Sequence, residues 1–219
     1  MSDPISIAIE YFPQLLKGLW VSVLLLASLV GVGTPLAFLA AIGLRSRFKI
    51  LRWTLIAIIE FARGIPSLIM LYLIYFGMPS VGLTLTSFVA ATIALSINYI
   101  GYVSDTMRSG IDSIPRGQLE AASALGLNRW HTVRFVTIPQ SFRIITPPLL
   151  SWIIVYFQTT AIAFTIAVPE LMSAAYSIAS KNFQYLTLFI LVGMIYAAFS
   201  IPGSQLVAAL ERRSSKSSV

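Results

Sequence analysis

The feature that most constrains this chain is the recurrence of long, almost uncharged apolar stretches. A helix needs about 20 apolar residues to cross the hydrocarbon core of a bilayer. Charged residues make up only 11% of the 219 residues, against roughly 25% in soluble domains. The pattern predicts an all-α polytopic membrane protein, with residues 1–219 forming one domain. We predict five transmembrane helices, over residues 16–44, 53–76, 87–107, 144–168 and 185–210.

The positive charges of the chain fall in a few segments between these spans. Twelve of the 15 Lys and Arg residues lie at positions 45–52, at positions 108–143 and in a short basic tail over residues 212–219. With five spans, all three segments are on one side of the membrane. Lys and Arg are enriched in cytoplasmic loops, so we expect the N-terminus outside and the C-terminus in the cytoplasm.

The composition argues against catalysis and metal binding by this chain. It contains no cysteine, and His131 is its only histidine. We therefore expect no catalytic residues and no metal ligands. The spans carry neither a Ser–His pair nor paired carboxylates of the kind that intramembrane proteases need. An ion-gradient-driven carrier or channel subunit stays open as an alternative function.

The second predicted span contains an ion pair and a helix-breaking sequence. Glu60 and Arg63 are three residues apart, so they share one helix face. Gly64 and Pro66 follow and interrupt the backbone hydrogen bonds. One interpretation is a self-neutralising pair packed on a neighbouring helix. The other is a broken helix beside a substrate path, as transporters use.

Two further spans carry polar residues near the middle of the membrane. Asn98 lies at the middle of the third span, and Gln158 lies just beyond the middle of the fourth. Asp105 can pair with Arg108 one turn later. Asn98 and Gln158 predict a pocket between the two spans, although Asn98 could equally hold helices together. The candidate substrate-pathway residues are Arg63, Asn98, Tyr102, Asp105, Gln158, Thr159 and Thr160.

The loop over about residues 111–139 has a strong helical pattern of its own. Residues 118–125 are good helix formers, and Gly126 is placed as a helix-ending glycine. Asn128 is a candidate N-cap for a second helical stretch over 128–136 that leads to Pro139. A helix–Gly–helix in a loop indicates either a docking element for a cytoplasmic partner or a solvated connection.

This loop resembles the EAA loop of ABC importer permeases. The match consists of Glu120-Ala121-Ala122, then Gly126, then Val136-Thr137-Ile138-Pro139. Over residues 15–211 the chain resembles the polar amino acid permeases of the histidine/glutamine type, a family of type I importers. The segments that carry this wider likeness are Arg63–Pro66, Tyr75–Gly77, Gly110–Gln118 and Pro169–Leu171.

The resemblance implies a function and a set of partners. Two permease subunits, as a homo- or heterodimer, would form the pore in a bacterial inner membrane. Two cytoplasmic ATPases would bind ATP and Mg, and an external solute-binding protein would deliver a polar amino acid or derivative such as an opine. This chain would be no enzyme and would bind no cofactor. Its ATPase-coupling residues would be Glu120, Ala121, Ala122, Gly126, Arg129 and Pro139.

The chain departs from the family pattern where charges are expected. Phe157-Gln158 stands where the family usually has Lys-Asp, and Ser151 or Trp152 stands at a position that is usually acidic. Asp105 replaces a Glu. Either a second, different permease subunit supplies the charged site, or the substrate is recognised mainly through hydrogen bonds.

Overall fold

The computed structural model describes residues 4–216, and all the secondary structure in this part of the chain is helical, joined by short turns. The all-α fold class predicted from the sequence is therefore confirmed. The elements in chain order are α1 (Pro4–Leu44), α2 (Lys49–Gly64), α3 (Ser67–Gly77), the 3₁₀ turn η1 (Met78–Val81), α4 (Ser87–Asp112), α5 (Arg116–Ala124), α6 (Arg129–His131), the π segment η2 (Thr132–Thr137), α7 (Ile138–Thr159), the 3₁₀ turn η3 (Thr160–Ile166), α8 (Leu171–Asn182) and α9 (Tyr185–Lys216).

Four of these helical segments are long and apolar enough to cross a membrane, and the bent pair α2–α3 makes a fifth candidate. The number of spans agrees with the prediction, but several boundaries do not. Helix α1 begins at Pro4 rather than near residue 16, and α9 continues to Lys216. Helix α1 runs through Pro13 and α9 runs through Pro202, so neither proline ends its helix.

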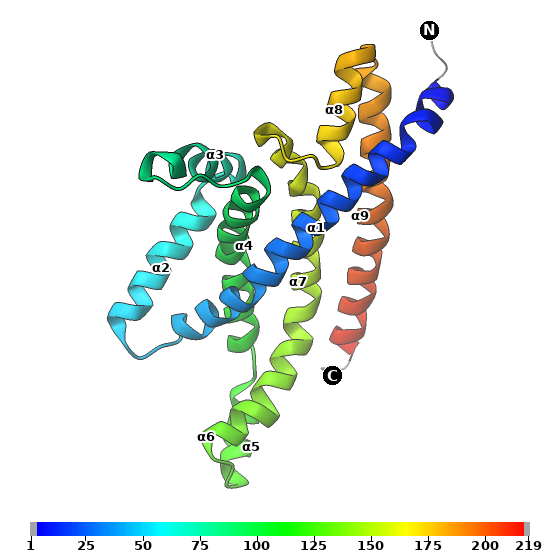
Figure 1. Ribbon diagram of the computed structural model, residues 1–219. Coiled ribbons are helices and arrows are strands. Elements are labelled where there is room, and N and C mark those ends of the chain that lie inside the picture. Colours follow the sequence, from blue (N-terminus) through cyan, green and yellow to red (C-terminus); the bar gives the residue numbers. More distant parts are fainter. Residues whose placement is uncertain (1–3, 217–219) are drawn as a thin grey trace.

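Helix α4 lies at the centre of the bundle. It packs against α1, α2, α3 and α7, while α8 packs against α1 and α9. Figure 1 shows α1 crossing the bundle diagonally in front of α4 and α7. Three buried alanines of α4, Ala90, Ala91 and Ala94, lie in the main core. Small side chains let membrane helices approach closely, which explains the tight contact with α1.

The three segments that carry most of the basic residues lie toward the same end of the molecule. The α1–α2 loop, the α5–α6 region and the last turns of α9 lie toward the lower end in Figure 1, opposite the N-terminus. An ion pair of 2.9 Å between Arg45 and Asp112 joins the first of these segments to the end of α4.

The second predicted span is two helices rather than one, interrupted at Gly64 and Pro66 as the sequence predicts. The helices α2 and α3 meet at 101° across the segment Gly64–Pro66, which we call the break. Ile65 is extended, with φ −92° and ψ 127°. A proline disfavours helical geometry at the residue before it and cannot donate a backbone hydrogen bond, so Pro66 ends α2 and starts α3.

The helix ends predicted in the loop at 111–139 are confirmed. Gly126 has φ +73°, Leu127 N–H donates to the Ala122 carbonyl at 3.1 Å, and Gly126 N–H donates to the Ser123 carbonyl at 3.0 Å. These bonds form a Schellman motif, which needs a left-handed residue at that point. The Asn128 side chain accepts from His131 N–H at 2.9 Å, as expected of an N-cap.

The second helical stretch does not stop before Pro139, and the fourth span does not begin near residue 144. Helix α6, the π segment and α7 follow one another without a gap from Arg129 to Thr159. In the wider π turn, Ile138 N–H donates to the Val133 carbonyl. The helix continues through Pro139, which has no N–H to donate. The loop is thus joined directly to a membrane span.

Candidate functional site

The break between α2 and α3 is held by the side chain of Asn98 on α4. Its amide nitrogen donates to the carbonyls of Ala62 at 2.8 Å and Ile65 at 3.1 Å. Its Oδ1 accepts from Ser67 Oγ at 2.7 Å and from the Tyr156 hydroxyl at 2.8 Å. An asparagine side chain has two donor hydrogens and two acceptor lone pairs, so every one is used. Asn98 therefore satisfies carbonyls that the broken helix leaves free.

Two neighbours of Asn98 on α4 complete the contact with the break. The Tyr102 hydroxyl donates to the Arg63 carbonyl at 3.0 Å. A Cβ on Gly101 would lie 3.0 Å from Arg63 N and 3.3 Å from Ala62 Cβ. Glycine at 101 therefore lets the α4 backbone come close enough for both polar side chains to reach the break.

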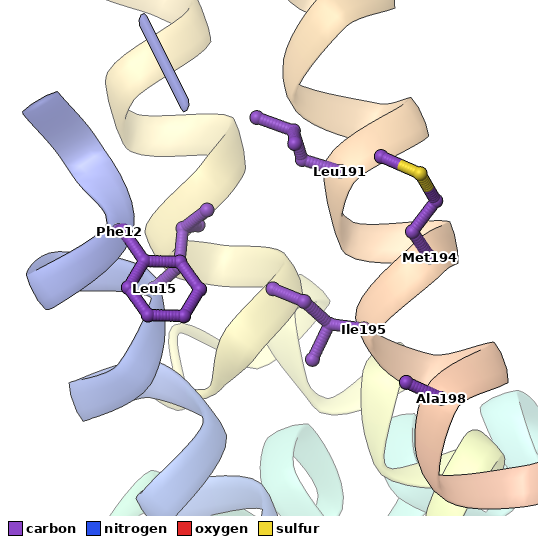
Figure 2. A pocket seen from close by; sticks show the side chains of 6 residues that line it. All are labelled: Phe12, Leu15, Leu191, Met194, Ile195 and Ala198. Atoms are coloured by element: carbon purple, nitrogen blue, oxygen red, sulfur yellow. The ribbon is translucent and has the colours of Figure 1, made fainter. Parts of the chain in front are cut away.

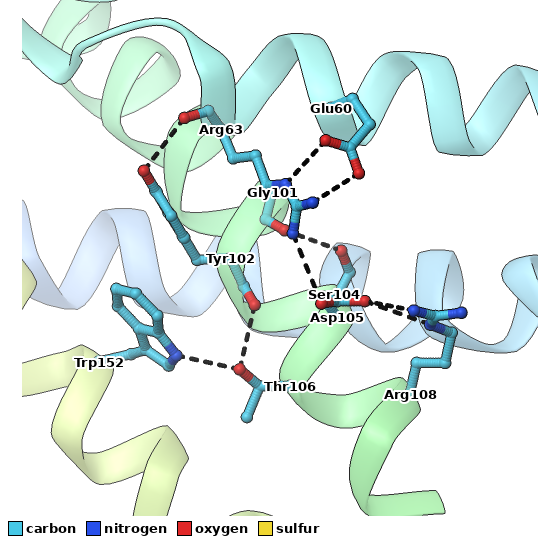
Figure 3. Close-up of polar contacts among 9 residues, drawn as sticks. All are labelled: Glu60, Arg63, Gly101, Tyr102, Ser104, Asp105, Thr106, Arg108 and Trp152. Atoms are coloured by element: carbon cyan, nitrogen blue, oxygen red, sulfur yellow. Dashed lines mark hydrogen bonds and ion pairs between the residues drawn. The ribbon is translucent and has the colours of Figure 1, made fainter. Parts of the chain in front are cut away.

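Four charged side chains form a cluster beside the break, drawn in Figure 3. Arg63 pairs with Glu60 at 2.6 Å, as the i, i+3 spacing predicts, and with Asp105 at 3.5 Å. Asp105 also pairs with Arg108 at 2.7 Å, which confirms the second predicted pair. The sequence did not reveal that Asp105 bridges the two arginines and so joins α2 to α4. The four formal charges sum to zero.

Helix α7 reaches the same region through two aromatic side chains. Trp152 stacks on Tyr102 with ring centroids 4.8 Å apart and donates from Nε1 to Thr106 Oγ1 at 3.0 Å. Tyr156, one turn later, donates to Asn98. The contact is built from two ladders at i, i+4 spacing, one at 98, 102 and 106 and the other at 152 and 156. Sequence analysis missed Trp152 and Tyr156, and this matching spacing is the signal that could have found them.

The residues predicted for coupling lie on and around α5. Glu120 and Ala121 are exposed, whereas Ala122 is buried. Gly126 ends the helix, and a Cβ there would meet nothing within 4 Å. Its role in this chain is thus the left-handed turn and not close packing. Pro139 lies in the first turn of α7. The backbone of Arg129 starts α6, but its side chain lies outside the described residues.

A second polar cluster, centred on Glu170, lies at the opposite end of the bundle. Glu170 is fully buried, and its carboxylate accepts from Ser173 N–H at 2.7 Å and Met172 N–H at 2.9 Å, as the N-cap of α8. It also accepts from Tyr196 at 3.2 Å and Ser22 at 3.3 Å. Burial raises the pKa of this carboxyl, which lies between two spans, to about 7, and the hydrogen bonds oppose that rise.

The role of Glu170 was not identified from the sequence, although it lies in a segment that supports the family resemblance. An acidic residue directly before a helix of good formers is a recognisable N-cap signal. The cluster joins α1, α8 and α9, so its role in this arrangement is to hold elements together.

A model of one protein family matches residues 33–216, which is most of the chain. That family is described as "Binding-protein-dependent transport system inner membrane component". The chain belongs to this family. It is therefore a multi-pass transport permease and no enzyme, as expected, since the ATPase of such systems is a separate subunit.

Two relatives from Bacillus subtilis are similar along most of their length. The probable amino-acid ABC transporter permease protein YckA is 38% identical over 192 residues, covering 88% of this chain and 85% of YckA. The probable glutamine ABC transporter permease protein GlnM is 31% identical over 215 residues, covering 97% and 99%. A solved structure, the crystal structure of an amino acid ABC transporter with histidines, has a TM-score of 0.90 and 32% identity, covering 97% of this chain and 99% of that one.

Phe157 and Trp152 of this permease are packed aromatic rings, whereas the family resemblance implies a charge at position 157 and at 151 or 152. Phe157 is buried, and its ring centroid lies 5.2 Å from that of Tyr196 and 5.7 Å from that of Phe199. Trp152 is stacked on Tyr102. Neither side chain can serve as a charged ligand where it lies.

Asn98 and Gln158, which were predicted to line one pocket, do not face each other. The partner of Asn98 on α7 is Tyr156, and Gln158 is exposed, about 200° further round the helix. Thr159 donates to the Val155 carbonyl at 2.8 Å and Thr160 to the Phe157 carbonyl at 2.6 Å, so both hydroxyls bond to their own helix. This back-bonding is a common role for Thr in membrane helices.

The permease also has an apolar groove between α1 and α9, with a volume of about 290 Å³. Figure 2 shows its lining side chains, which come from both helices. They are Phe12, Leu15, Leu191, Met194, Ile195 and Ala198. None of them can hydrogen-bond the amino or carboxyl group of a polar solute, so this groove does not fit such a substrate.

Proposed function

We propose that this permease imports a polar amino acid or an amino acid derivative, such as an opine, into the bacterial cytoplasm. The observation that carries the proposal is the likeness over nearly the whole chain to a solved amino acid ABC transporter, with a TM-score of 0.90. YckA and GlnM, which are named as amino-acid and glutamine permeases, support the same substrate class.

The charged cluster supports a solute path beside the break. Glu60 follows Trp53 by seven residues, so it lies about 10 Å along the membrane part of α2 and within the hydrocarbon core. Charges at that depth face the interior of a bundle or a water-filled cavity. Glu60, Arg63 and Asp105 are each at least one-third exposed in the single chain. We therefore place the solute path, shared with a second permease subunit, along this face.

Partner ATPases would drive alternating access through α5. The exposed face of α5 carries Glu120 and Ala121, and one continuous helix leads from Arg129 into α7. A displacement of α5 would thus move Trp152 and Tyr156, which contact α4 and the break. Gly126→Val, strained at φ +73°, should abolish uptake while the subunits still co-purify. Gly126→Asn is the matched control, because Asn tolerates left-handed geometry. Normal uptake by the Val variant would argue against docking here.

We further propose that this chain is the non-binding half of a heteromeric pair. The packed ring of Phe157 stands where the family resemblance implies a charge, and Ser151 or the packed Trp152 stands at the position that is usually acidic. An amino acid carries two opposite charges that need such partners. A different permease subunit would supply them, with Gln158 exposed toward the shared path.

The basic segments indicate the orientation, with the α1–α2 loop, α5 and the end of α9 in the cytoplasm and the N-terminus outside. A reporter fused after Gly82 should then report the external side. A cytoplasmic signal there would reverse the orientation.

Affinity purification of the tagged permease from native membranes, followed by mass spectrometry, tests the assembly. An ATPase together with a second permease that carries Lys-Asp would support the importer and the non-binding half. An ATPase with this permease alone would indicate a homodimer and overturn the non-binding half. Recovery of no ATPase under mild extraction would contradict the proposed assembly.

A further inference from the structure

We propose that the segment Arg47–Trp53, from the α1–α2 loop into the first turn of α2, binds the headgroups of anionic phospholipids. We call this segment the α1–α2 patch. It combines a cluster of cations with large exposed apolar side chains at the membrane boundary.

The charge of the patch is not balanced within the chain. Residues 45–52 hold four Lys and Arg, and the next acidic residue is Glu60. Arg45 pairs with Asp112, which leaves Arg47, Lys49 and Arg52. Among residues 4–216 no ion pair to these three is found, and all are exposed. Three uncompensated cations over six residues match a phosphate-bearing partner.

Large apolar side chains alternate with these cations. The exposed fractions are 85% for Ile50, 76% for Phe48 and 61% for Trp53. The Arg52 guanidinium lies over the Trp53 ring, 6.0 Å from its centroid. Trp is enriched at the membrane–water interface, and basic helices with such apolar side chains lie in it. Exposed rings beside cations fit the boundary between headgroups and acyl chains better than they fit water.

The position of the patch distinguishes it from the docking region. In Figure 1 the α1–α2 loop lies at about the level of the lower end of α9, whereas α5 and α6 extend further. The apolar residues of α2 that enter the membrane follow Trp53 directly. The patch is therefore at headgroup depth, while the proposed ATPase-binding helix lies beyond it. A lipid headgroup is thus the partner that this surface fits, whether or not the chain imports amino acids.

Native mass spectrometry of the full purified chain, titrated with phosphatidylglycerol in neutral detergent, tests the proposal. The variant Arg47→Gln/Lys49→Gln/Arg52→Gln removes the three cations. Attraction of each such residue to an anionic surface corresponds to about a fivefold change in binding, so we expect at least a tenfold loss of apparent affinity for phosphatidylglycerol. Phosphatidylcholine should bind weakly to both proteins.

The matched control is Arg212→Gln/Arg213→Gln/Lys216→Gln, which removes the same formal charge from the C-terminal basic segment, on the same side of the membrane in the proposed orientation. It should lose no more than twofold. An equal loss of affinity for phosphatidylglycerol in both triple variants would show only general charge attraction and would contradict a specific lipid site at the patch. Displacement of the lipid by millimolar inorganic phosphate would indicate a free-phosphate site instead. If the patch variant aggregates, Arg47→Gln alone lies before the first turn of α2 and should still weaken binding severalfold; unchanged binding would contradict the proposal.

Discussion

The two polar clusters of this permease lie in different parts of the bundle and are built on different principles. Glu170 is a single buried carboxylate that accepts four hydrogen bonds from neutral donors of α1, α8 and α9. The cluster around Arg63 contains four charges of both signs, is at least one-third exposed and joins only α2 to α4.

This difference indicates which region can rearrange. The donors of Glu170 come from fixed backbone and helix positions, and a buried polar group that loses its partners is strongly destabilising. Asp105, in contrast, lies between two arginines at 2.7 and 3.5 Å and can exchange one for the other. We infer that the Glu170 end fixes α1, α8 and α9 together, while the exposed charged cluster beside the break can rearrange its ion pairs.

The largest effect is expected for Glu170→Ala. It removes the N-cap of α8 and leaves Ser22, Tyr196 and two backbone N–H groups without their acceptor. We expect a loss on the order of 3 kcal/mol in the free energy of unfolding, measured by thermal unfolding in detergent. Glu170→Gln keeps the shape and one acceptor oxygen and should lose less. Equal unfolding temperatures for wild type and the Ala variant would show that the Glu170 cluster does not stabilise the bundle, and so would contradict the contrast with the Arg63 cluster.

The pH dependence of stability should also trace to Glu170. Its folded-state pKa of about 7 lies above the ordinary value of a carboxyl group, so the folded state holds the proton more tightly. Stability from this group is therefore full below the ordinary pKa and is lost as the pH rises toward 7, by at most about 1.4 kcal/mol per pH unit. Wild type should lose stability between pH 5 and pH 8 relative to Glu170→Gln. Parallel profiles would contradict a raised pKa.

A smaller effect on stability, but a clear one on transport, is expected for Tyr156→Phe. The change removes only the hydroxyl that bonds Asn98, and so the direct hydrogen bond from α7 to the side chain that holds the break, while Trp152 still stacks on Tyr102. The loss of one buried hydrogen bond corresponds to about 1 kcal/mol. Uptake in cells should fall severalfold if α7 carries motion to the break.

Tyr99→Phe is the matched control for that variant. Tyr99 is also buried on the α4–α7 contact, but its hydroxyl bonds Thr34 of α1 at 3.1 Å and does not reach the break. It should lower stability to a similar extent and leave uptake near normal. If both variants lost uptake equally, the link from α7 to the break would be no more than a packing contact.

The sequence predicts some features of this permease well because they depend on local chemistry. Apolar length gave the number of spans, i, i+3 spacing gave both ion pairs, and Gly126 and Asn128 gave the helix ends in the loop. Each of these features is decided within one or two helical turns. The resemblance through the loop motif gave the family for the same reason, since the motif is a short contiguous segment.

Features that depend on contacts between spans could not be predicted in this way. From the sequence, Asn98 could equally contact substrate or hold helices together. The structure favours the second role, because the carbonyls of Ala62 and Ile65 that it bonds become free only where α2 and α3 meet at 101°. Gln158 looked equivalent in depth, but the rotation of α7 directs Tyr156 toward Asn98 instead. The burial of Glu170 could not be predicted, because it depends on α1 and α9, which are far from α8 or from each other in the sequence.

The smallest effect on stability is expected for Arg63→Gln. Arg63 is about one-third exposed, and exposed ion pairs contribute about 0–1 kcal/mol. After the change, Asp105 keeps Arg108 at 2.7 Å, and Glu60, which is more than half exposed, can be reached by water. The unfolding temperature should therefore shift far less than in Glu170→Ala, while uptake falls if the cluster lines the solute path. Arg108→Gln, which removes the other partner of Asp105, serves as the control for charge alone. An Arg63 variant as unstable as Glu170→Ala would mean that both clusters are rigid, and the charged cluster could not be the region that rearranges.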